Sequence, residues 1–191
     1  MEKGFTLIEL LIVIGILAIL ATTVVLVLNP AQILAETRDT QRVSDLGTVQ
    51  SAIGLMLATD ATIPTFVAGP LCTVAGCAAG APLACGGFTL TPCAVNTIRL
   101  VNGTGWVGID LEGTSGGSSL SALPFDPTNN TTFYYGYAGD NTNKTYEINA
   151  RLESVKLRVN MQNDGGDDNT CTTFLEATCW YEIGTDSALN L

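Results

Sequence analysis

The sequence predicts an α+β protein in which a long N-terminal α-helix packs on a small antiparallel β-sheet head with disulfide-stapled loops. Three observations support this prediction. The first half of the expected helix is one continuous apolar run, and in the second half apolar residues recur every three or four positions. Strand-like segments and six cysteines follow in the rest of the chain.

The apolar run extends from Phe5 to Leu28, and Glu9 is its only charged residue. At about 1.5 Å per residue, this run is long enough to cross a hydrocarbon core of about 30 Å. A carboxylate in such a span costs about 3 kcal/mol on insertion scales, so Glu9 needs a partner or a role. The small residue Gly4 precedes the run, whereas a secretory signal peptide has its small residues after the run. Cleavage after Gly4 would therefore leave the hydrophobic segment on the mature chain.

The residues that begin at Gly4 read G-F-T-L-I-E-L-L-I-V-I. This segment resembles the class III leader and N-terminal helix of bacterial type IV pilins and of type II secretion pseudopilins. The resemblance implies that prepilin peptidase cuts between Gly4 and Phe5 and that Phe5 is then N-methylated. It also implies that Glu9 is the acidic residue that the family carries at the fifth position after the cut.

A physical reason for this spacing follows from helix geometry. Cleavage would leave the α-amine of Phe5 as a cation one helical turn, or about 6 Å along the axis, from Glu9. In a filament, the amine of a neighbouring subunit would lie against Glu9, so that two charges that are costly alone neutralise each other. The alternative is a Glu9 carboxylate that is hydrated or protonated near the membrane surface.

The helix is expected to be irregular at two positions. Pro30 removes a backbone donor and disfavours helical geometry at Asn29, which predicts a kink. Gly15 is a second weak point, because helices of the pilin family loosen near such a glycine in the fibre. The predicted division is a leader at residues 1–4, a helix at 5–58 with parts 5–28 and 29–58, and a β-rich head at 59–191.

The second part of the helix is predicted to be amphipathic, with an apolar stripe that packs on the sheet. This stripe consists of Val43, Leu46, Val49, Ile53 and either Met56 or Leu57. Charged residues lie between these positions, namely Arg38, Asp39, Arg42 and Asp45. They are interpreted as a solvated face with weak ion pairs, or alternatively as bridges to neighbouring subunits.

The head contains strand-like segments that predict an antiparallel meander. These segments are residues 97–101, 106–109, 132–137, 146–152 and 180–183. The stretch L-P-F-D-P-T-N-N-T-T-F-Y-Y-G-Y resembles the sheet region of pilins and of the major pseudopilin. Its aromatic residues are expected in the core, with only one alternating set of rings buried.

The cysteines favour disulfides over a metal site. No CxxC pair and no histidine accompanies them, and an exported domain experiences an oxidising environment. Cys171 and Cys179 are close in sequence and are expected to bond to each other. The remaining four cysteines are then expected to pair among themselves, with three connectivities open, and these are Cys72, Cys77, Cys85 and Cys93.

An acidic loop is the one candidate ion site. It offers the carboxylates of Asp164, Asp167 and Asp168, which are the type of ligand that Ca²⁺ prefers, but it lacks the EF-hand spacing. The resemblance adds support, since related pseudopilins carry calcium in a C-terminal loop. The alternative is a solvated acidic turn, and no other cofactor is expected.

Composition excludes some functions. The chain has no histidine and no catalytic constellation, so no enzyme is expected. With 8 basic and 18 acidic residues its net charge is −10, which disfavours direct nucleic-acid binding.

The resemblance implies a structural subunit. The precursor would wait as a single-pass protein in the inner, or cytoplasmic, membrane, and prepilin peptidase would cut it. An inner-membrane assembly platform would then build it into a helical homopolymer, an extracellular type IV pilus for adhesion, twitching motility or DNA uptake. Two alternatives stay open, a pseudopilin of a type II secretion system and a monomeric membrane-anchored binding module.

Overall fold

The structure is a computed structural model that describes most of the chain. The described residues are 4–59, 70–75, 84–88, 93–113, 116–167, 170–171, 179–185 and 191, with only the backbone of Leu26, Ala84 and Cys85. The elements in chain order are α1 (Leu7–Leu28), α2 (Pro30–Thr59), β1 (Leu71–Cys72), the 3₁₀ helix η1 (Ala84–Gly87), β2 (Ala94–Val95), β3 (Tyr135–Asp140), β4 (Thr145–Ala150), α3 (Arg158–Gln162) and β5 (Tyr181–Gly184).

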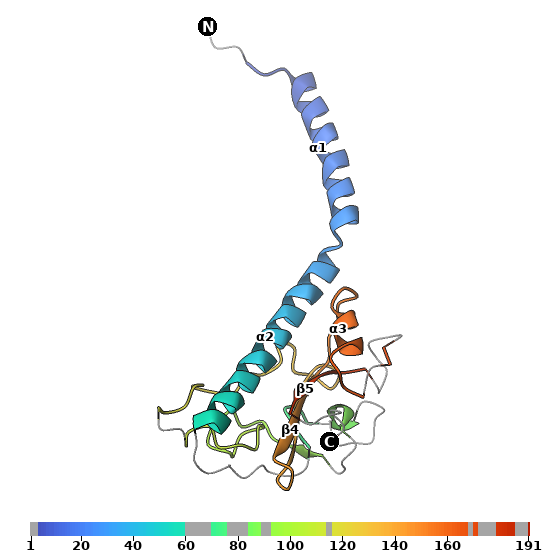
Figure 1. The fold of residues 1–191 in the computed structure, drawn as a ribbon. Coiled ribbons are helices and arrows are strands. Elements are labelled where there is room, and N and C mark those ends of the chain that lie inside the picture. The colour runs from blue at the N-terminus through green and yellow to red at the C-terminus, as the bar shows by residue number, and fades with distance from the viewer. Residues whose placement is uncertain are drawn as a thin grey trace.

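The two long helices have different surroundings. Helix α1 projects away from the head as a stalk, whereas α2 lies along the head (Figure 1). Helix α1 continues through Gly15 without interruption, and the chain breaks only at Asn29. A single glycine costs only about 1 kcal/mol in a helix, so α1 of the single chain stays continuous at Gly15. The loosening near Gly15 that the resemblance implies for the fibre stays a prediction.

Helix α2 covers one face of the sheet through the predicted apolar stripe. Leu46, Val49, Ile53 and Met56 are fully buried, and Val43 is partly buried. They pack with residues from β3, β4 and the preceding loops, including Trp106, Leu123, Tyr135, Tyr137 and Ile148. The prediction of an amphipathic helix packed on a sheet is therefore confirmed.

The sheet has five strands in the order β2-β1-β3-β4-β5 and is mostly antiparallel. Strands β3, β4 and β5 confirm three of the expected segments. Two expectations are wrong, because residues 97–101 and 106–109 form loops joined by a bridge between Asn102 and Asp110. The edge of the sheet opposite β5 is formed by the two-residue strands β1 and β2, which pair with each other in parallel.

The aromatic residues of β3, together with Tyr134 directly before it, are buried on both faces of the sheet. Tyr135 and Tyr137 face α2, whereas Tyr134 packs on the other side, edge to face with Trp180. Phe88 also covers this second face and lies so close to Gly136 that an added Cβ would be 2.7 Å from its ring. The expectation that only one alternating set is buried is therefore wrong, because the loops build a second apolar layer.

Candidate functional site

The N-terminal segment of α1 is organised by a reciprocal hydrogen-bonded cap. The hydroxyl of Thr6 donates to Oε2 of Glu9 at 2.7 Å, and the backbone N–H of Thr6 donates to the same oxygen at 2.9 Å. In return, the N–H of Glu9 donates to the Thr6 hydroxyl at 3.3 Å. This capping box begins the helix at Leu7 and places the carboxylate at its positive end.

The predicted cleavage position lies just before this cap. Gly4 and Phe5 are exposed and outside the helix, and the side chain of Phe5 is 84% exposed. The other residues of the predicted leader, 1–3, lie outside the described residues. Both residues that flank the predicted cut are therefore exposed within the chain itself, and cleavage would create an amine four residues before Glu9.

The surface of α1 is apolar all round. By length and composition, the 19 residues Leu7–Val25 suffice to cross a membrane, and none of them is buried in the chain itself. An isolated helix of this kind is stable only where lipid or other apolar helices surround it. The charged group of this segment, Glu9, is confined to its first turn.

The junction between α1 and α2 is a one-residue break. Asn29 adopts the left-handed conformation, with φ 39° and ψ 76°, and its carbonyl accepts a hydrogen bond from the N–H of Gln32 at 2.9 Å. Pro30 is the first residue of α2, where its missing N–H costs nothing. The predicted kink near Pro30 therefore lies at Asn29, and Figure 1 shows the resulting bend.

Below this junction, α2 is joined to the head by a buried charge cluster around Arg42. The guanidinium donates from Nε to Asp126 at 2.6 Å, and from Nη1 to Asp39 at 2.8 Å and to Glu153 at 2.7 Å. From Nη2 it donates to Asp126 at 3.0 Å and to Thr128 at 3.1 Å. All five N–H donors of the guanidinium are thus used.

Asp39 and Glu153 extend this cluster to the loop after β4. Asp39 accepts hydrogen bonds from the backbone N–H groups of Glu153 and Ser154, and Arg38 forms a two-pronged ion pair with Glu153 at 2.6 and 2.8 Å. Burial opposes ionisation of Glu153, but the hydrogen bonds from Arg38 and Arg42 outweigh it and hold its pKa below the ordinary value.

The interpretation of these charges as a solvated face is wrong for Asp39 and Arg42, which are completely buried within the chain. The sequence contained a signal for this. Arg42 and Asp39 lie four and seven residues before Leu46 in the same helical stripe, so they continue its buried face by two turns. Asp45 is also engaged, because it accepts a hydrogen bond from the hydroxyl of Tyr135 at 2.9 Å.

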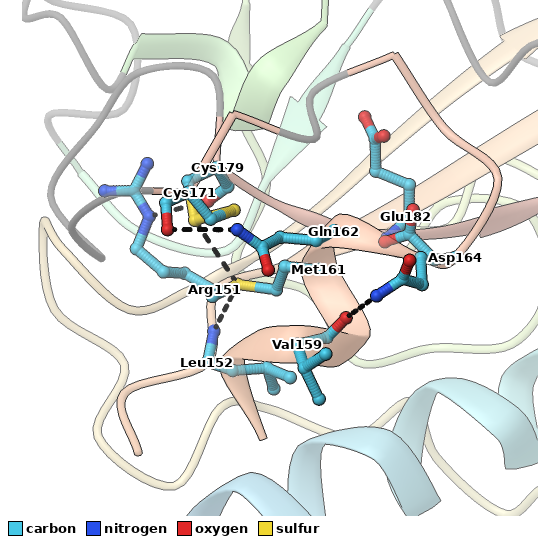
Figure 2. The surroundings of a disulfide bond; sticks show 10 residues. Arg151, Leu152, Val159, Met161, Gln162, Asp164, Cys171, Cys179 and Glu182 are labelled. Atoms are coloured by element: carbon cyan, nitrogen blue, oxygen red, sulfur yellow. Dashed lines mark hydrogen bonds between the residues drawn. A yellow bond between two sulfur atoms is a disulfide. The ribbon is translucent and has the colours of Figure 1, made fainter. Parts of the chain in front are cut away.

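The four cysteines whose side chains the structure describes are disulfide-bonded. Cys171 and Cys179 bond to each other beside α3, as predicted from the sequence (Figure 2). Cys72 and Cys93 are each disulfide-bonded as well. Cys77 and the side chain of Cys85 lie outside the described residues, so the pairing within this second group stays a prediction.

The candidate calcium loop is only partly described, because Asp168 lies outside the described residues. The carboxylate of Asp164 accepts backbone hydrogen bonds from Gly166 at 3.1 Å and Glu182 at 2.9 Å, which ties the loop to the edge strand β5. Within the described part of the chain, no three acidic, cysteine or histidine side chains gather as a metal cluster. A calcium site here therefore stays a prediction.

Comparison with known families identifies the N-terminal segment. Residues 1–25 match the family model described as the prokaryotic N-terminal methylation motif. The chain therefore carries a class III prepilin leader, as type IV pilins and pseudopilins do, and this motif marks a structural class of protein rather than an enzyme class. No curated protein and no solved structure matches the chain. The long apolar helix, the mostly antiparallel sheet and the Cys171–Cys179 disulfide fit the α+β pilin fold, and the leader and helix fit a membrane-anchored precursor.

Proposed function

We propose that the chain is a major-pilin-like structural subunit of a type IV pilus. Prepilin peptidase cuts the precursor between Gly4 and Phe5, Phe5 becomes N-methylated, and an inner-membrane platform assembles the mature chain into an extracellular homopolymer. The fibre serves adhesion, motility or DNA uptake.

The observation that carries the proposal is the surface of α1. Large apolar side chains are exposed along the whole helix, whereas the only carboxylate lies in the first turn beside the scissile bond. Such a helix is suited to two apolar environments in succession, first the bilayer and then a bundle of identical helices. Glu9 is the group that distinguishes the two, because a neighbour's amine can neutralise it only in the bundle.

The head supports the proposal by its attachment to the helix. The charge cluster around Arg42 binds α2 to two separate segments of the head, at Asp126 and at Glu153. Bending between stalk and head is thereby concentrated at Asn29, where a single left-handed residue separates two continuous helices. A subunit of this form can adjust its stalk without disturbing the fold of the head.

Electron microscopy and mass spectrometry of fibres sheared from the cell surface test the proposal. Abundant long fibres that contain this chain, with a methylated Phe5 as first residue, would support a pilin. Short, scarce filaments would indicate the pseudopilin alternative, and a chain found only in the membrane would indicate an anchored binding module. The variant Gly4→Val is expected to leave the uncut precursor in the membrane and to abolish fibres. Its control is Gly47→Ala, at a position where a Cβ meets open space.

A further inference from the structure

A hollow of about 300 Å³ lies in the head between α3 and the edge strand β5. It is lined by Val159, Asn160, Asn163, Asp164, Tyr181 and Ile183. All six residues lie in the described part of the chain: Val159 and Asn160 belong to α3, Asn163 and Asp164 follow it, and Tyr181 and Ile183 belong to β5.

The Cys171–Cys179 disulfide anchors the helical wall of this hollow. Met161 points from α3 toward the disulfide, with its sulfur 3.9 Å from Sγ of Cys179, and Gln162 donates a hydrogen bond to the carbonyl of Cys171 (Figure 2). The neighbouring residues Asn160 and Asn163 line the hollow. The opposite wall is β5, which begins at Tyr181, two residues after Cys179.

Three neutral polar side chains of the lining have unused hydrogen-bonding capacity. Among the described residues, neither the side-chain amide of Asn160 nor the hydroxyl of Tyr181 has a hydrogen-bond partner. The amide nitrogen of Asn163 donates to the carbonyl of Val159 at 2.8 Å, which leaves the amide oxygen of Asn163 to accept. An amide, an amide oxygen and a phenol are therefore offered to a ligand around one hollow.

The rest of the lining limits the chemistry of that ligand. None of the six residues is cationic, and Asp164 is acidic, which disfavours anionic ligands. A metal ion is disfavoured because Asp164 is the only carboxylate among these six residues. Val159, Ile183 and the half-buried ring of Tyr181 supply apolar surface next to the polar groups. A neutral molecule with several hydroxyls and an apolar C–H face matches this combination.

We propose that the hollow between α3 and β5 binds one neutral sugar unit, which hydrogen-bonds to Asn160, Asn163 and Tyr181. The carboxylate of Asp164 is held by the backbone so that its remaining lone pairs can accept from a sugar hydroxyl. This site belongs to the head alone, so it does not depend on cleavage or on filament assembly.

Saturation-transfer NMR on the full chain tests this site, in a detergent without a sugar headgroup. The probes are the methyl glycosides of glucose, galactose, mannose and N-acetylglucosamine, followed by titration of any that bind. At least one glycoside is expected to receive saturation from the protein. The variants Asn160→Ala and Tyr181→Phe are expected to weaken its binding by about three- to tenfold, the effect of one lost hydrogen bond. Both changes leave the packing of the head intact, because the side-chain amide of Asn160 has no partner and phenylalanine keeps the ring.

The control variant is Gln50→Ala, which removes an exposed amide on α2 and is expected to bind like the parent chain. The absence of saturation transfer to all four glycosides would overturn the proposal. Equal binding by the parent chain and Asn160→Ala would also overturn it, because the glycoside would then bind elsewhere. A response to Ca²⁺ alone, with no response to glycosides, would assign the hollow to a cation and would likewise overturn it.

Discussion

The Nε atom of Arg42 lies 2.6 Å from Oδ2 of Asp126, and both side chains are completely buried between α2 and the segment before β3. A buried ion pair is stable only if further hydrogen bonds satisfy both groups. Here Asp126 also accepts from the backbone N–H groups of Thr128 and Asn129, while Arg42 binds Asp39 and Glu153. The pair is therefore the centre of a network that joins the helix to the head.

Removal of Arg42 is expected to destabilise the head strongly. The variant Arg42→Ala leaves Asp39 and Asp126 buried without their counter-charge, which costs about 3 to 5 kcal/mol. Urea unfolding of the full chain in detergent, followed by the fluorescence of the buried Trp106 and Trp180, measures this loss. The control is Lys156→Ala, which breaks an exposed pair with Glu36 and should cost less than about 1 kcal/mol. Equal effects of the two variants would contradict the proposed importance of the network.

The same network predicts a loss of stability in acid. The pKa of Glu153 is lower in the folded chain than in the unfolded chain, so its ionisation favours folding. This contribution is complete above the unfolded pKa of about 4.3 and is lost as the pH falls through the lower folded value. Unfolding midpoints measured from pH 7 to pH 2 should therefore fall more steeply in the parent chain than in Glu153→Gln. Parallel curves for the two proteins would show that Glu153 does not contribute.

The two long helices could be predicted from the sequence because the patterns that indicate them are local. The apolar run with one charge, the apolar stripe at helical spacing and the proline each predict a local structure from residues that are close in sequence. The disulfide between Cys171 and Cys179 was accessible for the same reason, since the two residues are close in sequence. The match at residues 1–25 agrees with the leader read from Gly4 and Phe5.

The contacts that hold the head together could not be read in this way. The partner of Arg42 is Asp126, which is 84 residues away, and no periodicity indicates such a pair. Strands β1 and β2 have two residues each, too few for an alternating pattern to be visible. The hollow beside α3 is also formed by distant segments, and only the folded chain brings Asn160 and Tyr181 together.

Loss of the Cys171–Cys179 bond is expected to lower the stability of the head. Its sequence separation of 8 residues gives about 2 to 3 kcal/mol on the chain-entropy estimate. The double variant Cys171→Ser, Cys179→Ser should show this loss as a lower melting temperature. Reduction with a mild thiol should lower the melting temperature of the parent chain and should lower that of the variant by less. Non-reducing peptide mapping that found both thiols free would contradict the bond itself.

Replacement of Glu9 is expected to separate anchoring from assembly. Glu9→Ala makes the span more apolar, so the amount of the variant chain in the membrane should not fall. Fibre yield should fall at least about tenfold, because the amine of a neighbouring Phe5 loses its counter-charge. The exposed Glu112 provides the control, and Glu112→Ala should assemble normally.

A third variant distinguishes charge pairing from helix capping. Thr6→Ala removes the side chain that bonds to Glu9 within the chain but keeps the carboxylate, and the loss of such a cap costs about 1 kcal/mol. If the carboxylate acts on a neighbouring subunit, Thr6→Ala should retain most of the fibre yield that Glu9→Ala loses. Equal losses in both variants would indicate that Glu9 serves mainly to begin α1. A normal fibre yield from Glu9→Ala would disprove the charge-pairing role altogether.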